Sequence, residues 1–161
     1  MNIGVTYRRK FMSYDPKTER RENYPHFLAI PTRWKDVDTY QHVNNVVFYA
    51  YFDTVINEYL IKQGGLDYTD GQIVGFAVET HCQFLKPIQF PEIVDVGLRV
   101  AKLGNSSCRY EIGIFKQGVD EPCAVGYFVH VFVDRTQNNR PTPIAGKMRD
   151  ALEKLLSPEN Q

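Results

Sequence analysis

The sequence lacks the long apolar run that a membrane-spanning helix needs. Its longest uninterrupted apolar stretch, Val46 to Phe52, has seven residues, whereas a spanning helix takes roughly 20. The N-terminus carries Arg8, Arg9 and Lys10 with no apolar segment after them, so it also lacks the central region of a secretory signal. These two absences predict a cytoplasmic protein with no membrane partner.

A net charge is also absent, because 19 Lys and Arg residues balance 19 Asp and Glu residues. Nucleic-acid-binding proteins usually carry a clustered basic surface, so this balance argues against nucleic acid as a partner. Residues 1–25 depart from the balance, with six basic and three acidic side chains. We interpret residues 1–25 as a polar, basic and flexible leader and residues 26–161 as one domain.

Cysteine pairs and metal-ligand spacings are missing as well. Cys82, Cys108 and Cys123 are odd in number, far apart and embedded in alternating apolar segments, which is typical of reduced core residues. The four histidines are not grouped with one another. We therefore predict no disulfide, no metal site and no cofactor.

What the sequence does contain is one helical pattern followed by several strand patterns. Apolar residues recur at helical spacing over 45–62, and a glycine pair at 64–65 ends the run. After a first short strand within 26–34, period-two alternation predicts strands over 73–86, 93–103, 107–116 and 124–134. Their short links predict an antiparallel meander, and residues 145–156 a short amphipathic helix. The predicted fold class is α+β, a sheet wrapped around one long central helix.

The last predicted strand is apolar on both of its faces. Val125, Val129 and Val133 share one face, while Phe128 and Phe132 occupy the other. Such a strand has to be covered on both sides. The central helix covers one face, and a second copy of the chain is the cover that we predict for the other. A homodimer or a homotetramer is therefore expected.

The polar chemistry is concentrated between Arg33 and the start of the central helix. Its candidate functional residues include two carboxylates, an imidazole and the amides of two asparagines: Asp36, Asp38, His42, Asn44 and Asn45. The first turn of a helix presents unpaired N–H groups and a positive dipole end, which stabilise a developing oxyanion. A nearby carboxylate attacks a carbonyl or activates water. From spacing alone, however, helix capping is the simpler interpretation of the Asp and Asn residues.

These motifs together resemble the hotdog-fold acyl-CoA thioesterases of the 4-hydroxybenzoyl-CoA thioesterase type. The resemblance covers about residues 27–156. It rests on the Asp36-x-Asp38 pair, the His42-Val-Asn-Asn45 run, the aromatic segment 48–53, the strand end at Lys86-Pro87 and the late segment 140–144. It implies an antiparallel sheet wrapped around a long helix, and hydrolysis of an acyl-CoA to a free acid and CoA.

The resemblance also implies roles for individual residues. The family's catalytic carboxylate falls on Asp38, which acts either as a nucleophile or as a general base on water. The backbone N–H that polarises the thioester carbonyl falls near Asn45. His42 and Asn44 would orient the substrate, a water molecule or the loop, and Asp36 would support the loop.

The expected contacts to CoA are less complete. Arg140 matches a family arginine that contacts a CoA phosphate, a role suited to a planar cation. The turn at 104–107 lacks the basic pair that some relatives direct at the nucleotide, so Lys86, Arg109 or the leader could share that role with Arg140. Gln41 stands where many members have glycine. Glu79, on a predicted strand, is a candidate accessory acid.

Three functions remain open from the sequence. Acyl-CoA hydrolysis through Asp38, without a metal or redox cofactor, is the leading hypothesis. A non-catalytic acyl-CoA-binding module and an acyl-thioester dehydratase or hydratase are the alternatives. Tyr49, Phe52 and Phe84 are candidates to line an apolar acyl pocket, although ordinary core packing is the favoured explanation for each. Release of free thiol from acyl-CoAs separates the hypotheses, because only hydrolysis frees CoA.

Overall fold

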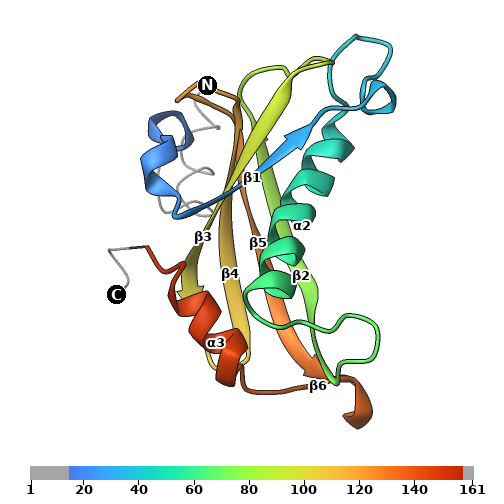
Figure 1. Ribbon diagram of the computed structural model, residues 1–161, viewed down its shortest axis with the longest axis vertical. Helices are drawn as coiled ribbons and strands as arrows, with labels where there is room; N and C mark the ends of the chain where they lie inside the picture. The colour runs from blue at the N-terminus through green and yellow to red at the C-terminus, as the bar shows by residue number, and fades with distance from the viewer. Residues whose placement is uncertain (1–14, 158–161) are drawn as a thin grey trace, which may run out of the picture.

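The computed structural model describes residues 15–157, in which a long helix lies along a curled antiparallel sheet (Figure 1). Helix α2 spans Asn45–Lys62, and the shorter helix α3 spans Gly146–Glu153. The strands are β1 His26–Pro31, β2 Ile73–Phe84, β3 Ile93–Leu103, β4 Ser107–Lys116, β5 Pro122–Asp134 and β6 Arg140–Pro141. This arrangement confirms the predicted α+β hotdog fold. Within residues 15–157, no helix has the length and apolar composition to cross a membrane.

The strand order is β1-β3-β4-β5-β2, with β6 added to the end of β5. The predicted meander is correct for β3, β4 and β5 but wrong for β2, which pairs with β5 instead of β3. The link from β2 to β3 contains two prolines, which disfavour an immediate return to the sheet. Its residue Ile88 is fully buried and accepts a hydrogen bond from the Val43 N–H at 2.7 Å. The link is thus tied to the segment before α2, and β1 and β2 become the two edges.

The core lies between α2 and the concave face of the sheet. The helix buries Phe48, Phe52 and Ile56 against inward-facing strand residues such as Val96. A Cβ at Gly126 would lie 2.6 Å from the Phe52 ring, so the glycine permits the close approach of helix and sheet. The three cysteines are free, and two of them are buried, which agrees with their prediction as core residues.

Residues 15–24, which we call the N-terminal strap, cross the outer face of the sheet. Two short 3-10 turns form the strap, η1 Pro16–Thr18 and η2 Arg21–Asn23. The ring of Tyr24 lies over Gly97 and Gly113, which pair directly across β3 and β4. A Cβ at these glycines would lie 2.8 Å and 2.9 Å from Tyr24 ring atoms. Only a strand position without a side chain leaves room for this ring.

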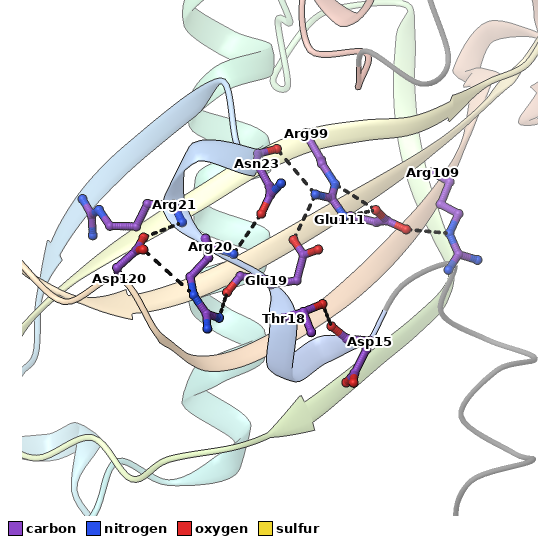
Figure 2. Close-up of polar contacts among 10 residues, drawn as sticks. All are labelled: Asp15, Thr18, Glu19, Arg20, Arg21, Asn23, Arg99, Arg109, Glu111 and Asp120. Atoms are coloured by element: carbon purple, nitrogen blue, oxygen red, sulfur yellow. Dashed lines mark hydrogen bonds and ion pairs between the residues drawn. The ribbon is translucent and has the colours of Figure 1, made fainter.

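Ion pairs hold the strap to the sheet (Figure 2). A Glu19 carboxylate oxygen lies 2.9 Å from Arg99, and Arg99 lies 2.7 Å from Glu111. Arg21 pairs with Asp95 at 2.8 Å. The described part of the predicted leader is therefore packed against the sheet, while its residues 1–14 lie outside the described residues.

Candidate active site

A small turn stands directly ahead of α2. Val37 and Val43 form an isolated antiparallel bridge that closes it. Inside the turn, the Asp38 N–H donates to the His42 carbonyl at 3.0 Å, and the Gln41 N–H donates to the Asp38 carbonyl at 3.0 Å. We call residues 37–43 the active-site turn. It ends at the residue before Asn44, so Asp38 lies on the loop that leads directly into α2.

The N-terminus of α2 is capped by Asn44. Its Oδ1 accepts a hydrogen bond from the Val46 N–H at 3.1 Å, which is the capping interpretation that the sequence left open. The Asn45 N–H has no hydrogen-bond partner among residues 15–157. A carbonyl oxygen placed here would meet a free donor and the positive end of the helix dipole.

The Asp38 carboxylate opens into a pocket of about 540 Å³. Asp38 is half-buried, and its Oδ1 accepts a hydrogen bond from the Tyr40 N–H at 2.8 Å. The other lining residues are Trp34, Val37, Gln41, Gln89 and Phe90. Trp34 is 79% exposed and contacts the Phe90 ring edge-on, with centroids 5.7 Å apart. The pocket thus joins one carboxylate to an apolar, aromatic wall.

Gln41 adopts a backbone conformation that favours glycine. Its φ of 65° lies in the left-handed region, where a side chain costs roughly 1–2 kcal/mol. Glycine adopts this conformation without that cost, which fits the expectation from the resemblance that glycine is common here. The turn keeps the conformation because its bridge and its hydrogen bonds over-determine it.

Asp36 is a support of the turn and does not line the pocket. It is 1% exposed. Its Oδ1 accepts from Arg33 Nη2 at 2.8 Å and Nε at 3.0 Å, and its Oδ2 accepts from the Arg33 N–H at 2.8 Å. The Tyr51 hydroxyl donates to Oδ2 at 3.3 Å. Burial alone would raise the pKa of Asp36, but these hydrogen bonds and the Arg33 charge outweigh burial and lower that pKa. Burial, with the neighbouring Asp36 charge, raises the pKa of Tyr51.

Two predicted residues lie away from Asp38 within one chain. Arg140 belongs to β6, at the opposite end of α2 from the active-site turn (Figure 1). Glu79 pairs with Val129 on the outer face of the sheet, where it accepts a hydrogen bond from the Tyr127 hydroxyl at 2.6 Å. A single chain therefore brings neither Arg140 nor Glu79 to the pocket.

The residues that the sequence suggested for the pocket differ in how deeply they are buried. Phe52 is fully buried in the core, which favours the packing interpretation for it. Tyr49 is half-buried and Phe84 is exposed. His42 is exposed, and its backbone carbonyl holds Asp38. Among residues 15–157, no group of His, Cys, Asp or Glu is arranged to hold a metal ion.

Sequence reasoning missed four residues of this region. Trp34 and Phe90 form the aromatic wall of the pocket, and Arg33 and Tyr51 hold Asp36. Arg33 carried a usable signal, because it stands three residues before Asp36. Tyr51 looked like one more aromatic residue on the buried helix face, and nothing in its spacing indicated a polar partner.

Comparisons with known proteins bear on the family and the fold of the chain. The model of the thioesterase-like superfamily matches residues 32–152. The crystal structure of the PA5185 protein from Pseudomonas aeruginosa strain PAO1 is 51% identical, with a TM-score of 0.85 over 87% of this chain and 97% of that one. A thioesterase from Thermus thermophilus, complexed with coenzyme A and Zn, is 29% identical, with a TM-score of 0.68 over 83% and 96%. The uncharacterized protein YsmA of Bacillus subtilis (strain 168) is 25% identical over 121 residues, 74% of this chain and 80% of YsmA.

Proposed function

Because this chain belongs to the thioesterase-like superfamily, we propose that it hydrolyses acyl-CoA thioesters to a free carboxylic acid and CoA, in the manner of the 4-hydroxybenzoyl-CoA thioesterase type. The observation that carries the proposal is a pocket carboxylate, Asp38, on the compact turn that leads directly into α2, whose first N–H, that of Asn45, has no hydrogen-bond partner among residues 15–157. Hydrolysis of a thioester needs both a group that attacks or activates water and a donor for the developing oxyanion.

The chemistry follows from these two groups. The Asn45 N–H donates to the thioester carbonyl oxygen and stabilises the negative charge that develops on it. Asp38 then acts in one of two ways. As a nucleophile, its carboxylate oxygen bonds to the carbonyl carbon, the C–S bond breaks, and water hydrolyses the resulting anhydride. As a general base, it takes a proton from a water molecule that attacks the same carbon. Both routes release CoA as the thiol.

We propose CoA thioesters as the substrate class because of similarity to a thioesterase that binds coenzyme A. The Thermus thermophilus thioesterase, 29% identical, is complexed with coenzyme A. In this chain the pocket beside Asp38 has aromatic walls and two glutamine side chains, which suits an apolar acyl group next to a polar thioester. His42 remains a candidate for orienting substrate or water from the exposed side of the turn.

The active form that we propose is a homodimer joined through β2. This edge strand exposes Ile73, Phe76, Val78 and Phe84, and an apolar edge is a template for pairing with another strand. Two copies of β2 paired antiparallel about a twofold axis would bring the β6 end of one chain to the active-site turn of the other. Arg140 of the partner subunit could then reach CoA bound at Asp38. An active monomer in sedimentation at micromolar concentration would contradict this assembly.

Release of thiol from a panel of acyl-CoAs tests the proposed function. The wild-type protein should release CoA thiol, and Asp38→Asn should lower kcat by at least about a hundredfold while the protein stays folded. The competing explanation is that Asp38 has a purely structural role, because its carboxylate also accepts a hydrogen bond from the Tyr40 N–H within the turn. Binding of acyl-CoA without thiol release would indicate a binding module, and an unchanged rate in folded Asp38→Asn would show that Asp38 is not the catalytic group.

A further inference from the structure

We propose that Arg33, Asp36 and Tyr51 form a positioning group that sets the distance between the Asp38 carboxylate and the first turn of α2. This inference rests on the proposed hydrolase function. None of the three residues lines the pocket, and none contacts the reacting atoms. Their action is exerted through the backbone of the active-site turn.

Several hydrogen bonds hold the Asp36 side chain in place. Its carboxylate is almost fully buried and accepts hydrogen bonds from the Arg33 N–H, from both arms of the Arg33 guanidinium, and from the Tyr51 hydroxyl. The planar guanidinium binds a carboxylate through two parallel contacts, which fixes orientation as well as distance. Both donors come from separate elements, since Arg33 precedes the η3 turn, Trp34–Asp36, and Tyr51 lies on α2.

Asp36 is connected to both halves of the candidate site. Its backbone carbonyl accepts a hydrogen bond from the Asn44 N–H at 2.8 Å. Asn44 is the residue that caps α2 and precedes the free Asn45 N–H. On the other side, Asp36 is two residues before Asp38 and adjacent to the bridge at Val37. A shift of Asp36 therefore moves the carboxylate of Asp38 relative to the oxyanion donor.

The charge of Asp36 contributes to these contacts. The lowered pKa of this carboxyl follows from its hydrogen bonds to Arg33 and Tyr51, so Asp36 is ionised when these contacts are made. An amide at this position keeps the shape of the side chain but turns one acceptor into a donor, which faces the guanidinium donors of Arg33. Asp36→Asn therefore weakens the hydrogen bonds within the group without leaving a cavity. Tyr51→Phe removes only the longer and weaker contact.

The chain offers a matched control for each variant. Glu111 is also a buried carboxylate held by two arms of an arginine, with Arg99 at 2.9 Å and 2.7 Å, but it lies on the outer face of the sheet (Figure 2). Tyr59 is a buried tyrosine of α2 whose hydroxyl donates to the Ala151 carbonyl at 2.7 Å. Glu111→Gln and Tyr59→Phe thus impose the same chemical changes at a distance from the active-site turn.

The kinetic test compares these pairs by thiol release. Misplacement of reacting groups by ~1 Å costs up to about a hundredfold in rate, and a partial shift should cost less. We expect Asp36→Asn to lower kcat about tenfold and Tyr51→Phe about threefold, with KM changed less than about twofold. Glu111→Gln and Tyr59→Phe should leave both constants near wild type, whatever they do to stability. Equal losses of kcat in a variant and its control would overturn the positioning role and leave only stability.

A second measurement does not depend on enzyme activity. Amide hydrogen exchange followed by NMR reports the opening of the hydrogen bond from Asn44 to Asp36. In Asp36→Asn, exchange at the Asn44 N–H should accelerate about tenfold more than in Glu111→Gln, because only the first variant frees the Asp36 backbone. The same acceleration in both variants would refute the coupling. A wild-type protein that releases no thiol would refute the proposed function, and the exchange result would still decide whether this group holds the turn.

Discussion

Truncation of Tyr24 tests whether the N-terminal strap is an integral part of the folded domain. Tyr24 is 4% exposed, and its ring packs against the strand positions Gly97 and Gly113. It makes edge-on contacts with Phe27 and Phe115, with centroids 6.2 Å and 5.7 Å away. The Arg99 guanidinium lies 4.9 Å from the ring centroid. Tyr24→Ala removes all of these contacts in one step.

The expected loss of stability can be worked out from this burial. An aromatic side chain buries ~150–250 Å², which at ~25 cal/mol per Å² corresponds to about 4–6 kcal/mol as an upper bound. The unfolded chain already buries part of that area. Truncation of buried aromatic residues usually costs ~3–5 kcal/mol, so we expect a decrease of about 3 kcal/mol in the free energy of unfolding. For a chain of this size, that lowers Tm by roughly 6–12 °C.

Thermal and urea denaturation followed by circular dichroism measure this loss. Tyr68→Ala is the control, because Tyr68 is 65% exposed on a loop and its truncation should cost less than about 0.5 kcal/mol. Similar values of Tm for the two variants would refute the packing argument.

Two further predictions concern single side chains. If Arg140 contacts a CoA phosphate, Arg140→Ala should raise KM for acyl-CoA about tenfold with a smaller effect on kcat, and hydrolysis of a truncated thioester without the nucleotide should not change. Equal losses on both substrates would exclude a phosphate contact. Burial lowers the pKa of His130 in the folded protein. As pH falls, the unfolded chain therefore takes up this proton at a higher pH than the folded protein does, and the free energy of unfolding should decrease below pH ~6.5. His130→Gln should make the free energy of unfolding depend less on pH between about 7.5 and 5.5, and an unchanged slope would contradict this assignment.

The helix and the strands could be predicted from the sequence because each has a clear period. The central helix begins and ends at the predicted residues, and β3 and β4 match their predicted ranges. The position of β2 could not be predicted in this way. Periodicity reports which residues share a face and says nothing about which strand lies alongside. The pairing of β2 with β5 depends on the path of the link through Ile88, a contact between residues distant in sequence.

The candidate site could likewise be predicted only in part. The turn before α2, with Asp38 and the capping Asn44, could be located because cap residues precede helices in a fixed order. The packed strap could not, since its ion pairs join Glu19 and Arg21 to strand residues more than 70 positions away. Its charged composition resembles that of a solvated tail. Charge pattern alone does not distinguish a tail from a segment whose charges are paired on a sheet.

The turn that carries Asp38 keeps its conformation at a cost in free energy. Gln41 holds a left-handed backbone that costs roughly 1–2 kcal/mol, and Asp36 holds a buried charge that is unfavourable without its partners. Either cost alone would favour a relaxed turn. The hydrogen bonds from Arg33, Tyr51 and Asn44 to Asp36 offset these costs in the observed arrangement, in which Asp38 lies on the turn that leads into α2. Variants that stabilise the turn in another conformation should therefore lose activity even when they gain stability.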